Sequence, residues 1–334
     1  MRQGLILQLQ DELGRTGWGE VAPLPWFGSE TLEQALAYCR SLPQRLSAEW
    51  IHTVPFTLPA CQFGFGSAWE DLQRRRRPSL GSNALPVGGL DAGGHHSKLD
   101  VQRDQVDDGP SEGRDRNLTL ELSRPLSYCG LLPTGAAALQ VWFDLWQQGY
   151  RTFKWKIGVA SVEEELNLLQ ALLQQLPPGT QLRLDANGGL SWEAALQWLD
   201  VCDHYRTQHS DRWSVSRIEY LEQPLPVDQF GALLHLGERS QTPLALDESV
   251  ATLNQLQYCL QQGWSGIFVL KPAIFGYPHK LRQMCQRYAL DVVLSSVFET
   301  EVGRRACLHL AQDLSTRGRA IGFGVSHWFD EGER

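Results

Sequence analysis

The sequence predicts an α/β protein, a modified (β/α)7β TIM-like barrel that follows an N-terminal α+β capping domain. Two observations predict this fold class. From residue 127 to the C-terminus, strand-like and helix-like segments alternate in regular order. In the same region, lysines and acidic residues recur at the carboxyl ends of the strand-like segments, which a barrel brings together at one mouth. We therefore expect two domains, residues 1–126 and residues 127–334.

Residues 1–126 have the pattern of a small α+β domain. Two strand-like segments, 3–10 and 17–23, are separated by a short turn, as in an antiparallel pair. Apolar residues with helical spacing follow at 31–45, and a second helix is expected at 59–72.

A stretch of different composition, about 78–117, interrupts this domain. It is rich in glycine and polar residues, contains no Phe, Trp or Tyr, and has no hydrophobic period. Such a segment buries too little apolar surface to offset the entropy that is lost on ordering. We expect a disordered insertion that lengthens a connection in the capping domain.

The second region supplies eight strand-like segments with amphipathic helical segments between them. The eight are 127–133, 151–157, 181–186, 217–222, 243–247, 266–271, 291–296 and 319–325. Parallel strands need crossover connections that cover the sheet, so the alternation is typical of a parallel barrel. An open doubly wound sheet has the same alternation, but the placement of the charged residues favours the barrel.

Composition excludes several classes of function. A net charge of -8 leaves no basic surface for nucleic acid, and no run of about 18 apolar residues predicts insertion into a membrane. The seven cysteines form no Cys-x-x-Cys pair, so neither disulfides nor a zinc site are expected. No signal-peptide pattern opens the chain. We expect a cytoplasmic protein whose partner is a small molecule, and the sequence leaves its oligomeric state open.

Three lysines and three acids stand at the predicted strand ends. They are Lys154, Lys156, Asp185, Glu222, Asp247 and Lys271. Lysine occurs at only five positions, although the chain contains 30 Lys and Arg together. Arginine stays charged and cannot act as a base, whereas lysine can lose its proton. The use of lysine at these positions therefore indicates catalysis.

Lys154 and Lys156 are two residues apart, so their side chains lie on one face of a strand. Inside a barrel mouth, each ammonium disfavours the charge on the other. We expect the pKa of at least one of them to fall below the usual value of about 10.4. A partly neutral lysine is a usable base near pH 7.

The three acids predict a metal site. Carboxylates on adjacent strands would repel one another without a positive charge between them. Hard oxygen ligands of this kind suit Mg²⁺, with water and a substrate carboxylate completing its coordination. The alternative is a set of ion pairs with the lysines. With a lysine on each side of the metal, the site would remove a proton α to a carboxylate, because the metal stabilises the charge that develops.

At these residues the chain resembles the enolase superfamily, in its muconate-lactonising branch, and most closely the o-succinylbenzoate synthase family. The strings that carry the resemblance are LRLDAN at 182–187, SSVFE at 295–299 and GWGEVAPLP at 17–25. The resemblance implies that the segment that follows, 27–31, is a mobile loop that closes on the substrate. The resemblance covers nearly the whole chain outside 78–117.

The resemblance implies that Asp185, Glu222 and Asp247 bind Mg²⁺. It implies that Lys156 takes the α proton and returns it to the departing hydroxyl. The reaction would be the syn dehydration of 2-succinyl-6-hydroxy-2,4-cyclohexadiene-1-carboxylate to 2-succinylbenzoate, a lyase step in menaquinone or phylloquinone biosynthesis.

Further roles come from the same resemblance. Lys271 would stabilise the enediolate from the opposite face, and Lys154 would support the base. Ser295 and Ser296 are expected to hold the succinyl carboxylate. Arg183, two residues before a metal ligand and on the same face, is expected to contribute to substrate binding and to tune the lysines.

Two other functions are compatible with parts of this pattern. An N-acylamino acid racemase or dipeptide epimerase of the same branch would use the same groups, with a lysine exchanging protons on each face. The short cap and Arg183 favour the synthase. A non-catalytic barrel that binds a small carboxylate or a protein partner would not need all six charged residues, and all six are present.

Overall fold

The computed structural model describes residues 3–76, 96–102, 124–208, 215–315 and 317–324. The chain divides into two compact units. The first comprises residues 1–123, 271–284 and 296–313, and the second comprises residues 124–270, 285–295 and 314–334. The second unit thus begins close to the expected domain boundary after residue 126. Two segments of the C-terminal half, however, make their contacts mainly with the N-terminal part.

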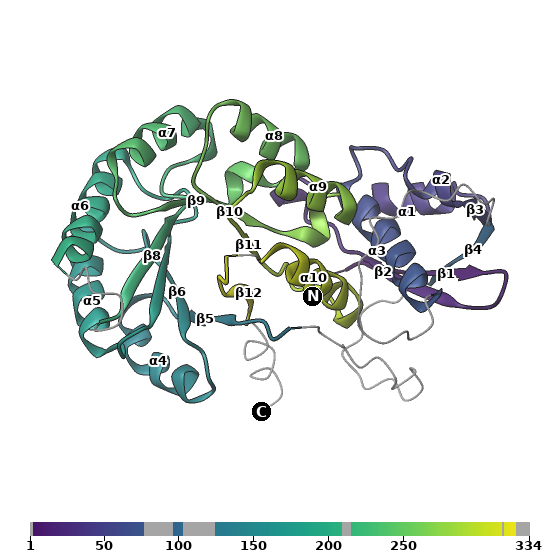
Figure 1. Cartoon of the computed structure of the whole chain (residues 1–334). Helices are drawn as coiled ribbons and strands as arrows, with labels where there is room; N and C mark the ends of the chain where they lie inside the picture. Colours follow the sequence, from purple (N-terminus) through teal and green to yellow (C-terminus); the bar gives the residue numbers. More distant parts are fainter. Residues whose placement is uncertain (1–2, 77–95, 103–123, 209–214, 316, 325–334) are drawn as a thin grey trace. The chain divides into compact units, whose positions relative to one another are not determined.

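An eight-stranded parallel sheet forms the centre of the second unit (Figure 1). Its strands are β5 (Tyr128–Leu132), β6 (Thr152–Lys156), β7 (Gln181–Asp185), β8 (Arg217–Glu222), β9 (Leu244–Leu246), β10 (Ile267–Leu270), β11 (Val292–Leu294) and β12 (Ile321–Gly324). The sheet order is β11-β10-β9-β8-β7-β6-β5-β12, with all pairs parallel. A bridge between Ser295 and Gly322 joins the two ends of this order, so the barrel is nearly closed.

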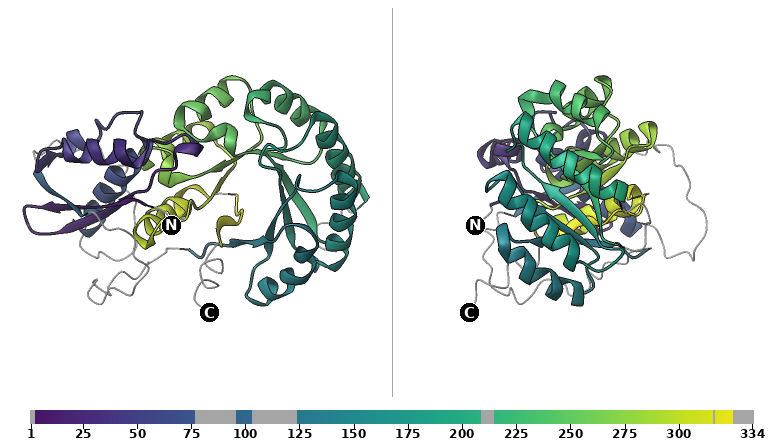
Figure 2. Two further views of the ribbon diagram at one scale, coloured as in Figure 1. Left: turned by 180° about the vertical axis from the view of Figure 1, so that it is seen from behind. Right: turned by 90° about the vertical axis from the view of Figure 1, so that its left-hand side faces the viewer.

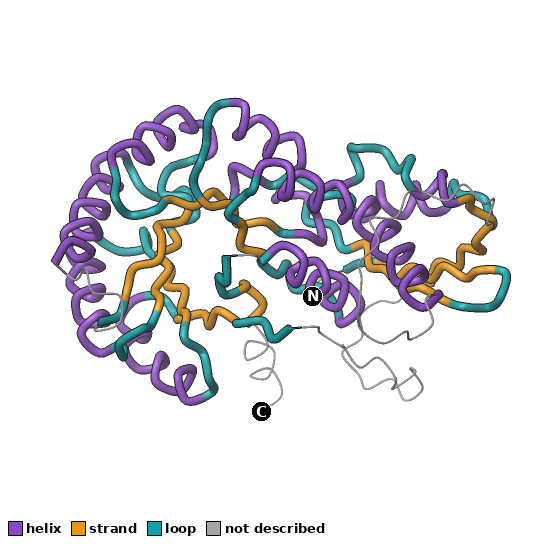
Figure 3. Tube along the Cα trace, viewed as in Figure 1, coloured by secondary structure: helices purple, strands orange, loops and turns teal. Residues whose placement is uncertain are grey.

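Over the described residues, seven helices alternate with these strands. They are α4 (Ala138–Gln147), α5 (Val162–Gln175), α6 (Trp192–Gln208), α7 (Phe230–Arg239), α8 (Leu253–Gln261), α9 (Pro278–Tyr288) and α10 (Glu301–Leu314). Helices α4 to α8 form an outer row around the strands in Figures 2 and 3. The order of elements confirms the predicted (β/α)7β barrel.

The barrel core fixes which way the strand residues point. Trp155 of β6 packs outward against Trp198 of α6, with ring centroids 6.3 Å apart. A buried cluster from the central strands fills the inside: Tyr220, Ala245, Ile267, Val269 and Val293. Because side chains alternate along a strand, Lys154 and Lys156 lie on the face opposite to Trp155.

The first unit contains a four-stranded antiparallel sheet in the order β2-β1-β4-β3. These strands are β1 (Leu5–Asp11), β2 (Thr16–Val21), β3 (Arg45–Ser47) and β4 (His96–Gln102). Its N-terminal helices are η1 (Pro25–Phe27), α1 (Leu32–Arg40), α2 (Ala48–Ile51) and α3 (Pro59–Arg76). This is the α+β capping domain that the sequence predicts.

Two glycines let α3 pack directly on the backbone of β2. A Cβ atom on Gly17 would lie 2.2 Å from the carbonyl oxygen of Ala68, and one on Gly19 would lie 2.0 Å from that of Gly64. Neither position has room for a side chain. The Gly-Trp-Gly sequence is therefore explained by close packing between a strand and a helix.

Two sequence predictions in this unit are wrong in part. Residues 96–102 belong to the stretch expected to be a disordered insertion, yet they form β4 and pair with both β1 and β3. The rest of that stretch lies outside the described residues. The helix expected at 31–45 ends at Arg40, since residues 45–47 pair with β4 instead. Both errors concern pairing with a strand that is distant in sequence.

None of the described helices combines the length and the apolar character needed to cross a membrane.

Candidate active site

Five of the six charged residues singled out by the sequence lie at the carboxyl ends of four neighbouring strands. Lys154 and Lys156 are on β6, Asp185 ends β7, Glu222 ends β8, and Asp247 follows β9. In the strand register, Lys156 pairs with Asp185, and Asp185 pairs with Glu222. These side chains therefore stand at the same level of the barrel mouth.

The ammonium of Lys154 connects two of the acids. Its Nζ lies 2.7 Å from Oδ2 of Asp185 and 2.8 Å from Oε1 of Glu222. Burial lowers the pKa of Lys154, but the charges of Asp185, Glu222 and Asp247 outweigh this and raise the pKa well above its ordinary value. For Lys154 the shift is thus opposite to the fall expected for a lysine pair, because two carboxylates contact its nitrogen.

Glu222 is fully buried, and one oxygen of its carboxylate, Oε2, has no hydrogen-bond partner among the described residues. Burial raises the pKa of Glu222 well above its ordinary value; Lys154 opposes this, and the charges of Asp185 and Asp247 reinforce it. A buried carboxylate oxygen without a partner is costly unless a cation lies beside it.

The donor set fits a hard divalent cation, although the three acids are not gathered as a ready-made site. Among the described residues, no group of three Asp, Glu, His or Cys side chains is close enough to hold a metal ion. Lys154 instead bonds two of the acids and offsets their repulsion. Three carboxylates on consecutive strands, one with an unpaired buried oxygen, are nevertheless the ligands that Mg²⁺ prefers.

Asn187 connects the candidate base to the acids. Lys156 donates from Nζ to Oδ1 of Asn187 at 2.5 Å. Nδ2 of Asn187 donates to Oδ2 of Asp185 at 3.3 Å and to Oε1 of Glu248 at 3.1 Å. Its backbone has a φ of 44°, a left-handed conformation that asparagine tolerates better than most residues. Sequence reasoning gave Asn187 no role.

Gln223 holds the backbone beside Asp247, and the sequence gave it no role either. Its buried Oε1 accepts from the backbone N–H of Asp247 and of Ser249, both at 3.1 Å. Its Nε2 donates to the carbonyl of Leu225 at 3.0 Å and to Oγ of Ser249 at 2.8 Å. All polar atoms of this amide are used, so the position of Asp247 is well fixed.

The remaining predicted residues lie at the ends of the next strands. Lys271 follows β10 and belongs to the first unit. Its Nζ lies 3.9 Å from the ring centroid of Phe27. Ser295 follows β11, and its backbone N–H donates to the last residue of β10 at 2.8 Å. The hydroxyl of Ser296 donates to the carboxylate of Glu299, with distances of 2.9 and 3.0 Å to its two oxygens.

Arg183 lies inside the barrel and is only 1% exposed. Its Nε donates to Oε2 of Glu219 at 2.7 Å, and its Nη2 donates to the carbonyl of Ala320 at 2.8 Å. Its guanidinium also lies 5.0 Å from the ring centroid of Tyr220. These contacts do not support the expected role in substrate binding; they place Arg183 in the structural core.

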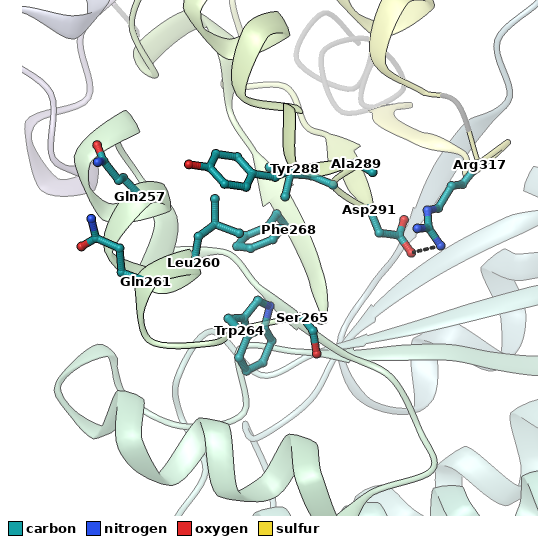
Figure 4. A pocket seen from close by; sticks show the side chains of 12 residues that line it. Gln257, Leu260, Gln261, Trp264, Ser265, Phe268, Tyr288, Ala289, Asp291 and Arg317 are labelled. Carbon is teal, nitrogen blue, oxygen red and sulfur yellow. Dashed lines mark ion pairs between the residues drawn. The ribbon is translucent and has the colours of Figure 1, made fainter. Parts of the chain in front are cut away.

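A cavity of about 420 Å³ lies at the other end of the barrel (Figure 4). Ser265 and Asp291, at the amino ends of β10 and β11, contribute to its wall, together with Trp264 and Tyr288. Arg317 and Asp291 form an ion pair there at 3.8 Å. Because catalytic groups in barrels gather at the carboxyl ends of the strands, this cavity is not the candidate active site.

Together, the fold and the strand-end residues are those of a barrel enzyme with a candidate active site of carboxylates and lysines. Residues 138–331 match a family described as enolase C-terminal domain-like. Residues 1–72 match the family described as MenC, N-terminal domain. The two matches cover the barrel from α4 onward and most of the described capping domain before α3 ends, and they leave out β5.

Individual proteins agree with these matches. An o-succinylbenzoate synthase from Thermosynechococcus vestitus is 40% identical over 98% of this chain and 86% of its own length. A similar solved structure is that of o-succinylbenzoate synthase from Thermosynechococcus elongatus BP-1, complexed with Mg in the active site. It aligns with this structure with a TM-score of 0.75, and the alignment covers 97% of this chain and 85% of that chain. The L-Ala-D/L-Glu epimerase of Bacillus subtilis shares the fold at 18% identity, with a TM-score of 0.66 over 96% of this chain and 81% of its own.

The chain therefore belongs to the o-succinylbenzoate synthase family of the enolase superfamily, and it is an enzyme of the carbon–oxygen lyase class.

Proposed function

We propose that this chain catalyses the Mg²⁺-dependent syn dehydration of 2-succinyl-6-hydroxy-2,4-cyclohexadiene-1-carboxylate to 2-succinylbenzoate. The observation that carries the proposal is the set of three carboxylates on consecutive strands with a lysine pair on the strand beside them. Further support comes from the similar T. elongatus synthase, whose structure contains Mg in its active site.

Asp185, Glu222 and Asp247 are the proposed ligands of Mg²⁺. The partnerless oxygen of Glu222 supplies one donor. A bound ion would hold the substrate carboxylate and stabilise the negative charge that develops when the α proton leaves. Gln223 and Asn187 fix the surroundings of two ligands through the hydrogen bonds described above.

Lys156 is the proposed base. It takes the α proton as the carbon–hydrogen bond breaks, and the electron pair moves towards the carboxylate. It then gives this proton to the hydroxyl group on the neighbouring carbon, which leaves as water while the ring becomes aromatic. One group performs both transfers, so both occur on the same face of the ring. The hydrogen bond to Asn187 holds the Lys156 nitrogen at the strand end.

Lys271 is proposed to stabilise the developing charge from the other face. In the sheet order, β6 and β10 stand on opposite sides of β7, β8 and β9, and Lys271 follows β10. Lys154 is proposed to support Lys156 by neutralising the acids beside it. Ser295 and Ser296 stay candidates for the succinyl carboxylate, and Arg183 is proposed to act only by holding the barrel strands in place.

The product would be a precursor of the naphthoquinone ring of menaquinone or phylloquinone. The cytoplasmic location expected from the sequence stays a prediction.

Turnover measured by absorbance tests this function. With Mg²⁺ present, the cyclohexadiene substrate should be converted to the aromatic product, excess EDTA should stop the reaction, and added Mg²⁺ should restore it. A folded protein that binds Mg²⁺ but gives no turnover would contradict the proposal. In that case, exchange of the α proton in deuterated water with N-acylamino acids or dipeptides would test the racemase alternative.

A further inference from the structure

The ring of Phe27 lies against the ammonium of Lys271, with Nζ 3.9 Å from the ring centroid. Both side chains are partly buried. We propose that Phe27 is a positioning residue, which holds the Lys271 ammonium in the place where it meets the developing charge of the substrate. This inference rests on the proposed function of Lys271 and names a residue on which that function depends.

The turn that carries Phe27 is closed by its own hydrogen bonds. The backbone N–H of Phe27 donates to the carbonyl of Leu24 at 2.9 Å, and that of Gly28 donates to Pro25 at 3.1 Å. Oγ of Ser29 accepts from the backbone N–H of Leu24 at 2.6 Å. Gly28 has a φ of 96°, which other residues rarely adopt. These bonds give the backbone that carries the ring a defined turn. The mobility that the resemblance implies for residues 27–31 stays a prediction.

Two buried acids anchor this turn within the first unit. After the turn, Glu30 accepts from the backbone N–H groups of Ala60 at 3.0 Å and Cys61 at 2.7 Å, in the first turn of α3. Before it, Glu20 accepts from Thr300 and Gly303 at the start of α10, both at 2.9 Å. Bonds between a carboxylate and backbone N–H groups at a helix start are among the stronger ones. The chain that carries Phe27 is thus anchored on both sides of the turn.

An aromatic ring suits this task better than an acid would. The face of the ring attracts an ammonium group through its quadrupole but neither neutralises its charge nor accepts its proton. A lysine side chain has several rotatable bonds, and holding it in one place before the substrate binds removes part of the entropy cost from the reaction. Lys271 is then held and still carries the charge that the reaction needs.

A direct test observes the contact itself. The chain has only five lysines, so a protein labelled with ¹³C-lysine gives a simple spectrum of their Cε groups. The Lys271 signal, assigned through Lys271→Arg, should be shifted upfield by the ring current of Phe27. It should move downfield in Phe27→Leu and stay in place in Phe27→Tyr. A Lys271 signal that does not move in Phe27→Leu would overturn the proposal, whether or not the protein shows synthase activity.

A second test follows catalysis. Phe27→Leu should lower kcat by roughly 3- to 30-fold with little change in KM, and Phe27→Tyr should keep most of the activity. Phe56→Leu is the matched control: Phe56 is 75% exposed in the same unit, so its replacement should leave kcat unchanged.

Fluorinated phenylalanines at position 27 should lower kcat progressively as fluorine weakens the ring quadrupole. An unchanged kcat in Phe27→Leu, or a fluorine series without a trend, would contradict the positioning role. No turnover by the unaltered chain would count against the proposed function instead.

Discussion

Glu222 has two properties that lower the stability of the folded protein, namely its burial and an unpaired carboxylate oxygen. It is fully buried, and its Oε2 has no hydrogen-bond partner among the described residues. Its other oxygen, Oε1, accepts a hydrogen bond from the ammonium of Lys154. Asp185 and Asp247 lie at the ends of the two neighbouring strands, β7 and β9. A cation among these acids would satisfy the open oxygen and remove the repulsion. These properties support the proposal that Glu222 is a metal ligand.

Glu222→Gln should weaken the binding of Mg²⁺. The amide keeps the shape of the side chain but removes its charge and leaves a single oxygen. Loss of an outer partner of a metal ligand costs about 10- to 100-fold in affinity, and loss of a ligand should cost at least as much. Calorimetric titration with Mg²⁺ measures the effect, with the exposed Glu238→Gln as control. Equal affinity in both variants would exclude Glu222 as a ligand.

The placement of Lys154, Lys156, Asp185, Glu222 and Asp247 at the strand ends could be predicted from the sequence, but the residues that support them could not. Lys156, Asp185 and Glu222 follow apolar strand segments, and a parallel barrel brings such ends together. Asn187 and Gln223 act through left-handed backbone conformations, with φ of 44° and 37°, and through bonds to residues far along the chain. No local hydrophobic pattern contains that information.

Strand β2 and helix α3 approach each other more closely than side chains on β2 would allow. Gly17 and Gly19 face backbone atoms of α3. The same strand carries Glu20, which caps α10, so its position matters for several elements at once.

Gly19→Ala should therefore destabilise the protein. The new Cβ would lie 2.0 Å from a backbone oxygen, which no side-chain movement can relieve, and overpacking of this kind costs typically 1–3 kcal/mol. Chemical denaturation measures the change. Gly231→Ala in α7 is the matched control: its Cβ would meet nothing within 4 Å, and alanine favours a helix, so it should be neutral or stabilising. Equal stability of the two variants would contradict the packing argument.

Elements with local signals could be predicted, and those that depend on distant partners could not. Strand β8 is found at 217–222, as the sequence predicts, because its alternating polar and apolar residues and its flanking helices define it. Strand β4 lies in a stretch with no hydrophobic period, and it exists through pairing with β1 and β3. Its own alternation of polar and apolar residues, from Lys98 to Gln102, is too short to predict a strand within such a stretch.

A partly buried ionic network connects the last strands of the barrel, β11 and β12, with β7 and β8. Glu219 of β8 bonds Arg183 of β7 at 2.7 Å and Arg319, just before β12, at 2.6 Å. Arg319 also bonds Asp291, just before β11, at 2.7 Å. Four strands are thus connected through one group of charges. The alternation of segments predicts a barrel, but it does not predict how the barrel is closed.

Stability should depend on Glu219 in a pH-dependent way. Burial raises its pKa, but Arg183 and Arg319 outweigh this and lower the pKa below its ordinary value. The folded-state pKa thus lies below the unfolded value of about 4.3, so the network stabilises the fold above about pH 4.3, and this contribution is lost as the pH falls through the folded-state pKa.

Glu219→Gln should cost about 3–5 kcal/mol at pH 7, because it leaves Arg183 buried without its counter-charge. The difference from the unaltered chain should shrink as the pH falls from the unfolded-state pKa of about 4.3 through the lower folded-state pKa, where Glu219 itself becomes protonated. Denaturant unfolding at several pH values measures both effects. A difference that stays constant with pH would show that the charge of Glu219 is not the cause.

The measurement that tests the central claim most directly is the turnover of Lys156→Ala together with its Mg²⁺ binding. Our account predicts no measurable dehydration in this variant, while calorimetry finds Mg²⁺ bound as tightly as before, since Lys156 contacts Asn187 and is not one of the proposed ligands. Lys280→Ala, which changes a lysine on α9, should keep full activity. Full turnover by Lys156→Ala would contradict the assignment of the base, and loss of Mg²⁺ binding would contradict the separation of base and metal site.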